Sequence, residues 1–204
     1  MKLGFLGGSF DPPHWGHLIL ASEAVHHLEL DRLEWVLTPD PPHKPHREFT
    51  PQNMRLELLQ AAVAGNSRFV ISRVDIDRPP PHYAAETMGI IRDQHPEDEL
   101  IYLMGEDSLR DLPDWYRPEL LIETVDGLGV MPRPDVSADH SALEETLPGV
   151  GDKVRLFPSP KIEISSSLIR KRAAAGGPYR YFVPRAVLEL IEKNQLYQQD
   201  TRAG

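Results

Sequence analysis

The segment that most constrains this chain joins its first apolar run to its first amphipathic helix pattern. It reads GGSFDPPHWGH over residues 7–17 and is called the glycine–histidine segment below. The run 3–6 in front of it predicts a strand. The stretch behind it predicts a helix with one apolar face, formed by Leu18, Ala21, Val25 and Leu28. Two glycines at a strand end allow a bound group to approach the backbone closely.

Two histidines close the segment. His14 and His17 are three residues apart, so a helix that begins near Pro13 would place both rings on one face, aimed at one ligand. Gly16 leaves that face without a side chain between them. The alternative is a strand–turn–helix junction whose polar residues only cap the helix and fill space. The joint spacing of the glycines, the Asp-Pro turn and the histidines favours the ligand site.

Strand and helix patterns alternate along the rest of the chain. This order predicts an α/β fold with a doubly wound, mostly parallel sheet, whose ligands bind beyond the carboxyl ends of the strands. We expect a single domain over residues 1–204, with 163–204 as a small C-terminal helical portion. Further strands are predicted at 33–38, 69–72, 100–104, 129–131 and 154–157. Further helices are predicted over 84–92, twice after 163, and from Thr50-Pro51, with Thr50 as N-cap and Pro51 as the first helical residue.

Two later stretches are interpreted from their residue patterns alone. Residues 133–151 are polar with a short helical pattern, and we expect them on the surface. The last helix carries Val187, Leu190 and Ile191 on one stripe and ends near Tyr197, which we interpret as core.

Composition narrows the class of protein. The chain has 22 Lys and Arg against 31 Asp and Glu, a net charge of −9, which argues against non-specific binding to nucleic acid. It has no cysteine, so disulfides and thiolate metal sites are excluded. No run approaches the roughly 20 apolar residues of a membrane span. We therefore expect a cytoplasmic protein without a membrane partner. A homo-oligomer is compatible with this sequence, which does not fix the oligomeric state.

Local cations stand out against this acidic background. Lys44 and Arg47 lie on a proline-stiffened loop after the second strand, at the expected ligand edge, and Lys44 is the first choice for a phosphate contact. A helix predicted to begin near Ser165 has no acidic residue in its first turn and carries Arg170 instead. Such a helix start favours an external anion, so its serines, free amides and arginine form a candidate triphosphate clamp. The alternative is a serine N-cap followed by solvated basic residues.

The glycine–histidine segment resembles the GG(S/T)FDPxHxGH signature of the nucleotidylyltransferase superfamily, which has a Rossmann-like fold. Residues 164–170, ISSSLIR, are similar to the ISS(S/T)xIR motif of bacterial nicotinate-nucleotide adenylyltransferases, and Gly105-Glu106-Asp107 followed by Trp115 is similar to their GxD and tryptophan. Tyr83 matches an R-x-x-x-S-Y-T stretch that opens a helix in this family. His82 and Ala84 replace its serine and threonine.

The resemblance implies adenylyl transfer from ATP to nicotinate mononucleotide, giving deamido-NAD and pyrophosphate as a step of NAD biosynthesis. Magnesium is expected, held mainly by substrate phosphates, and no aspartate cluster marks a protein metal site. The implied catalytic residues are His17, His14, Lys44 and Arg170. The implied ATP-binding residues are Gly7, Gly8, Ser9, Phe10, His14, His17, Gly105, Asp107, Ile164, Ser165, Ser166, Ser167 and Arg170. The implied acceptor-binding residues are Ser9, Lys44, Tyr83, Ala84, Trp115 and Arg133.

Other functions remain open from the residues alone. The glycine–histidine motif is shared by transferases that act on other phosphorylated acceptors, such as nicotinamide mononucleotide or phosphopantetheine. The departures at His82 and Ala84 leave the choice between nicotinate and nicotinamide open, since backbone amides survive a side-chain change but a threonine hydroxyl does not. A non-catalytic nucleotide-binding protein is the alternative from a different class, and a binder has no need for groups that stabilise a leaving pyrophosphate.

Overall fold

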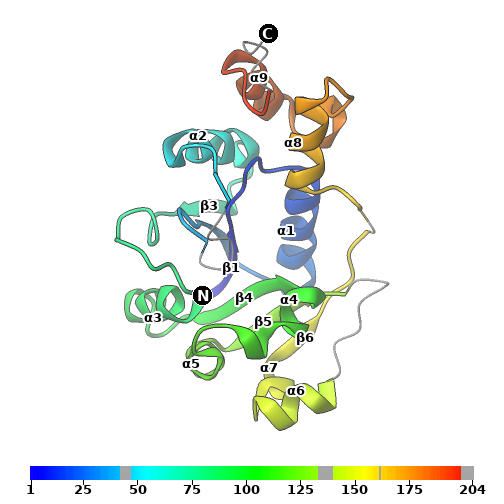
Figure 1. Ribbon diagram of the computed structural model, residues 1–204. Coiled ribbons are helices and arrows are strands. Elements are labelled where there is room, and N and C mark those ends of the chain that lie inside the picture. Colours follow the sequence, from blue (N-terminus) through cyan, green and yellow to red (C-terminus); the bar gives the residue numbers. More distant parts are fainter. Residues whose placement is uncertain (42–46, 133–139, 161, 199–204) are drawn as a thin grey trace.

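A parallel sheet forms the centre of the molecule (Figure 1). The computed structural model describes residues 1–41, 47–132, 140–160 and 162–198. Within these residues six strands run in the order β3-β2-β1-β4-β5-β6, and all neighbouring pairs are parallel. The predicted α/β class and doubly wound sheet are therefore confirmed. The strands are β1 (Lys2–Gly8), β2 (Arg32–Leu37), β3 (Phe69–Ser72), β4 (Glu99–Gly105), β5 (Gly127–Met131) and β6 (Val154–Leu156).

The order of the strands changes side at β1: β2 and β3 lie on one side of it, and β4, β5 and β6 lie on the other. Leu6 in β1 lies opposite Trp35 of β2 on one side and Leu103 of β4 on the other. The two halves of the sheet diverge at the carboxyl ends of β1 and β4, where open α/β sheets bind ligands. The glycine–histidine segment leaves β1 at this point, and Gly105 ends β4 at the same edge.

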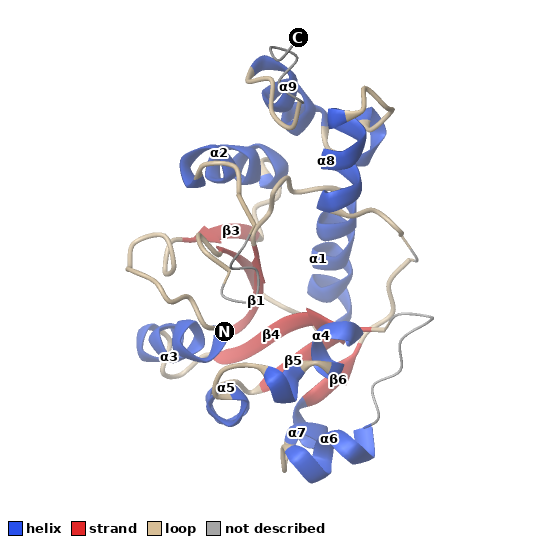
Figure 2. Cartoon of the chain, viewed as in Figure 1, coloured by secondary structure: helices blue, strands red, loops and turns tan. Residues whose placement is uncertain are grey.

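Helices cover both faces of the sheet (Figures 1 and 2). On one face α1 and α2 bury Ala21 and Leu59 in an apolar cluster that includes Trp35, and on the other α3 and α5 bury Met88 and Leu121 in a cluster around Phe5. The helices between the strands are α1 (Trp15–His27), α2 (Gln52–Val63), α3 (Ala84–Gln94), α4 (Glu106–Arg110), η1 (Leu112–Asp114), α5 (Pro118–Thr124), α6 (His140–Thr146) and α7 (Val150–Lys153).

The C-terminal helices form a third apolar cluster with α2. They are α8 (Ser166–Ala174), η2 (Arg180–Phe182) and α9 (Arg185–Lys193). Ile169 of α8 and Val187 and Ile191 of α9 are fully or almost fully buried together with Leu58 of α2. The stripe predicted for the last helix is thus a packing surface. Because it packs on α2, the start of α8 is brought to the carboxyl edge of the sheet, as Figure 1 shows.

Three local predictions need correction. The first helix begins at Trp15 rather than near Pro13, because His14 is extended, with φ −149°, and serves as its N-cap. Pro51 is the N-cap of α2 rather than its first helical residue. Leu143 and Leu147, predicted to lie on the surface, are only 5% and 2% exposed, because their aliphatic side chains join the core beside α5.

The described part of the chain contains no helix with both the length and the apolar character needed to cross a membrane.

Candidate active site

Two glycines at the end of β1 give space to neighbouring rings. A Cβ on Gly7 would lie 3.2 Å from the hydroxyl oxygen of Tyr102, and a Cβ on Gly8 would lie 3.0 Å from the Phe10 ring. Neither glycine has a positive φ. They are therefore required for close approach rather than for an unusual backbone conformation. Phe10 itself is buried, and its ring meets that of His17 edge-on at 5.2 Å, so its side chain supports the histidine.

His14 and His17 lie together at the start of α1. Their rings stack with centroids 3.7 Å apart, and the His14 backbone N–H donates to Nδ1 of His17 over 3.3 Å. Burial lowers the pKa of His14 to about 4, and burial followed by the charge of His14 lowers the pKa of His17 well below its ordinary value. Both imidazoles are therefore neutral at pH 7 without a ligand. An anion placed beside them would favour their protonated forms, which suits a phosphate site.

Gly16 lets a third segment approach these rings. A Cβ at this position would lie 3.0 Å from Nδ1 of His14 and 3.4 Å from the carbonyl oxygen of Ile164. Nδ1 of His14 is buried and has no hydrogen-bond partner among the described residues. The sequence interpretation of Gly16 as a residue that clears this face agrees with the geometry.

Asp11 connects three distant parts of the chain, and we call this group the Asp11 junction. Its carboxylate, 1% exposed, accepts hydrogen bonds from Nη2 of Arg47 at 2.8 Å and from the Tyr197 hydroxyl at 2.9 Å. Its backbone carbonyl accepts from Nη1 of Arg170 at 2.6 Å. Burial, and then the nearby charge of Arg47, lower the pKa of Arg170. The junction therefore places two arginines on the glycine–histidine segment.

The start of α8 docks on the same segment. Ser165 is its N-cap and accepts from the Leu168 backbone N–H at 3.2 Å. The Ser166 hydroxyl donates to the Pro12 carbonyl at 2.9 Å, and Nη2 of Arg170 donates to the Ser167 hydroxyl oxygen at 2.9 Å. The helix start predicted near Ser165 is confirmed, and so is the alternative N-cap role of this serine. In this conformation the hydroxyls bind protein groups, which leaves the first amides of the helix as the groups suited to an anion.

Sequence reasoning missed the role of Arg55. This side chain is 2% exposed in α2 and donates to four backbone carbonyls, those of Ser9, Thr38, Pro39 and Thr50, at 2.6–3.1 Å. It thereby joins the loops that follow β1 and β2. Arg55 stands three residues before the inward-facing Leu58, and a charged residue on an apolar helical stripe was the available signal.

Tyr83 and Trp115, both expected on the acceptor side, have different ring partners. Tyr83 is the N-cap of α3, and its ring stacks on Tyr116, with centroids 4.1 Å apart and an interplanar angle of 23°. Trp115 packs against the core and meets Tyr102 edge-on at 6.2 Å. Ala84 is the first residue of α3. Tyr116, which the sequence reasoning missed, is thus the direct ring partner of Tyr83.

The remaining predicted residues have simple placements. Gly105 is the extended N-cap of α4, and Asp107 lies in the first turn of that helix, at the carboxyl end of β4. Lys44 and Arg133 lie outside the described residues.

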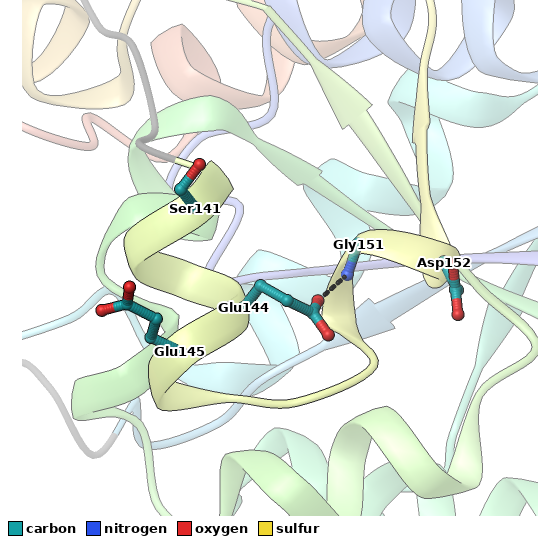
Figure 3. A pocket seen from close by; sticks show the side chains of 5 residues that line it. All are labelled: Ser141, Glu144, Glu145, Gly151 and Asp152. Atoms are coloured by element: carbon teal, nitrogen blue, oxygen red, sulfur yellow. Dashed lines mark hydrogen bonds between the residues drawn. The ribbon is translucent and has the colours of Figure 1, made fainter.

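A surface hollow near α6 does not fit the same ligand. Figure 3 shows that Glu144, Glu145 and Asp152 line it together with Ser141 and Gly151. Glu144 accepts hydrogen bonds from the backbone N–H groups of Gly149 and Gly151, which lower its pKa. Clustered carboxylates repel phosphates, so this hollow is not the nucleotide site.

Comparison with known proteins agrees with this geometry. Residues 5–172 match the Cytidylyltransferase-like family. A protein from Thermomicrobium roseum named "Probable nicotinate-nucleotide adenylyltransferase" is 43% identical over 97% of this chain and 92% of its own length. One of the same name from Thermus thermophilus is 40% identical over 97% of this chain and 100% of its own length.

Solved structures show the same fold at low sequence identity. Nicotinic acid mononucleotide adenylyltransferase of Plasmodium falciparum complexed with NaAD superposes with a TM-score of 0.78 at 17% identity, covering 96% of this chain and 97% of that one. The same protein complexed with APC gives 0.76 at 18% identity, with 96% of each chain covered. On the sequence matches, this chain belongs to the cytidylyltransferase-like family and, within it, to the nicotinate-nucleotide adenylyltransferases.

Proposed function

We propose that this chain transfers the adenylyl group of ATP to nicotinate mononucleotide, forming deamido-NAD and releasing pyrophosphate. The relatives named above carry the name of this activity, and one neighbour of similar fold is described with NaAD bound. One observation carries the proposal. The start of α8 docks on the glycine–histidine segment, so Arg170, free helix amides and two neutral histidines meet at the switch point of the sheet.

The reaction requires no covalent intermediate with the protein. An oxygen of the mononucleotide 5′-phosphate attacks the α-phosphorus of ATP, a new P–O bond forms, and the bond to the pyrophosphate oxygen breaks. The attacking oxygen is already an anion, so no general base is required. Holding the two substrates in line can lower the activation barrier by up to about 7–11 kcal/mol.

The phosphates occupy the space beside His14 and His17. His17 hydrogen-bonds the α-phosphate as negative charge builds, while His14, Lys44 and Arg170 stabilise the departing pyrophosphate. The backbone of residues 7–10 and the amides of residues 164–167 line the ATP site, so the C-terminal portion 163–204 completes it. Gly105 and Asp107 lie at the end of β4, where a carboxylate suits ribose hydroxyls.

In this proposal the acceptor binds at the start of α3. The first amides of this helix, from Ala84 onward, carry positive partial charge that suits the nicotinate carboxylate. Trp115 offers a plane for the pyridine ring. Tyr83 stacks on Tyr116 at the same helix start. Ser9, Lys44 and Arg133 serve the acceptor phosphate and ribose.

Magnesium accompanies ATP in this proposal. The described residues include no group of three histidine or carboxylate side chains that could hold a metal ion. We expect phosphate oxygens and water to be the main ligands of the ion, which would neutralise phosphate charge.

The deciding experiment compares acceptors. The purified chain is incubated with Mg²⁺, ATP and either nicotinate mononucleotide, nicotinamide mononucleotide or phosphopantetheine, and pyrophosphate and the adenylylated product are both measured. We expect nicotinate mononucleotide to give the highest kcat/KM. An equal or higher kcat/KM with another acceptor would overturn the substrate assignment. If ATP binds but none of the three acceptors releases pyrophosphate, the assignment as a transferase is wrong.

A further inference from the structure

Tyr197 is a partly buried tyrosine that the proposed reaction does not use. It follows α9 and packs into the cluster that joins α2, α8 and α9. Its φ of 63°, like the 52° of Gln195, lies in the left-handed region that favours glycine. Non-glycine residues keep such conformations where surrounding contacts hold them. The hydroxyl donates a 2.9 Å hydrogen bond to Oδ1 of Asp11, which lies 186 residues away in the sequence, and it also interacts with the side chain of Thr50.

Each oxygen of the Asp11 carboxylate has its own donor in the junction. Tyr197 donates to Oδ1 and Arg47 to Oδ2. Because the carboxylate is 1% exposed, water cannot readily replace a lost donor. Burial and the charge of Asp11 raise the pKa of Tyr197, which keeps its phenol protonated as a donor. The orientation of Asp11 therefore depends on a residue at the far end of the chain.

The same aspartate binds two of the arginines that we assign to the phosphate site. Its carbonyl holds Arg170, and its carboxylate holds Arg47. The charge of the buried Arg55 also acts on this group. Arg47, Arg55 and Arg170 outnumber the two carboxylates that act on this group, those of Asp11 and Asp40, and a triphosphate can balance the excess of positive charge. A rotation of the Asp11 side chain would displace Arg47 and move the carboxylate charge that acts on Arg170, although the backbone carbonyl of Asp11 would still bind Arg170.

We propose that Tyr197 is a positioning residue that orients the Asp11 carboxylate, so that Arg47 is held, and the negative charge near Arg170 is fixed, in the arrangement that receives the ATP phosphates. This inference rests on the proposed function. It differs from a purely structural role because it predicts an effect on the kinetics of ATP and not on those of nicotinate mononucleotide. Loss of the hydroxyl disturbs the phosphate side of the site, whereas the acceptor side at α3 is built by Tyr83, Tyr116 and Trp115 on other elements.

The test is Tyr197→Phe, which keeps the ring in the cluster and removes only the hydroxyl. We expect kcat/KM for ATP to fall about tenfold or more, as for loss of a hydrogen bond to a charged group, while the KM for nicotinate mononucleotide changes less than about twofold. Tyr179→Phe is the matched control. Tyr179 packs against the same cluster, and the hydrogen bonds of Asp11 within the described residues do not involve it. This control should keep the parent kinetics.

A double-mutant cycle tests the connection through Asp11. If Tyr197 acts through the carboxylate, Tyr197→Phe should add little to the loss already caused by Asp11→Asn, whereas independent effects would add. An unchanged kcat/KM for ATP, an equal rise in both KM values, or additive effects would each overturn the inference. If Tyr197→Phe does not fold, Asp11→Asn alone must raise the KM for ATP and spare that for the mononucleotide.

Binding of ATP separates this inference from the proposed function. Titration calorimetry with Mg²⁺ and a non-hydrolysable ATP analogue reports the phosphate site without any turnover. A parent chain that binds the analogue but forms no deamido-NAD refutes the proposed function, and a weaker affinity of Tyr197→Phe then still supports the inference. A parent chain that is active, with an unaltered affinity in the variant, refutes the inference alone.

Discussion

Acid should destabilise this protein through His14. Its pKa falls from the ordinary 6.5 to about 4 because the ring is buried, so the unfolded chain binds this proton more tightly than the folded one. Stability contributed by the neutral ring is complete above pH 6.5, and it is lost as the pH falls toward 4. The full difference is about 3.4 kcal/mol, of which about 2 kcal/mol is already lost at pH 5.

The measurement is urea unfolding without nucleotide at pH 7.5, 6 and 5, for the parent chain and for His14→Gln. Between pH 7.5 and pH 5, the free energy of unfolding of the parent should fall by about 2 kcal/mol more than that of His14→Gln. His26→Gln, at an exposed histidine of the same helix, is the control for the loss of an imidazole as such. Parallel stability curves for the parent and His14→Gln would refute the argument that burial keeps the His14 ring neutral.

Three further substitutions test the site. His17→Ala should lower kcat about 100-fold or more and leave the ATP affinity within a few-fold, because the ring is assigned to charge that develops in the transition state; turnover within a few-fold of the parent would remove that role. Trp115→Ala should raise the KM for nicotinate mononucleotide about two- to tenfold, as expected for lost ring stacking, and a selective effect on ATP would contradict it. Arg55→Met should destabilise the fold by about 3 kcal/mol or more in urea unfolding, since it leaves four carbonyls without their donor, and a loss below about 1 kcal/mol would show that water replaces the guanidinium.

The local pattern of residues was enough to predict the sheet. Alternation of strand and helix signals gave the parallel, doubly wound fold, and β3 begins and ends at the predicted residues, Phe69 and Ser72. The start of α8 at Ser165 and the closeness of His14 and His17 also followed from sequence. These features depend on neighbours a few residues apart, so short-range periodicity and capping chemistry carry the information.

Tertiary structure decided the contacts that tie the site together. Arg47 and Tyr197 meet at Asp11 across 36 and 186 residues, and Arg55 reaches the loops after two strands. No periodicity links such positions, because their distance depends on how α2, α8 and α9 pack. Tyr197 belongs to an apolar pattern and reads as core, yet its hydroxyl reaches a buried carboxylate. Sequence determined the sheet and the two histidines beside it. Packing of the C-terminal helices determined that Arg170 and Tyr197 reach Asp11, since residues so far apart in the sequence meet only where the fold brings them together.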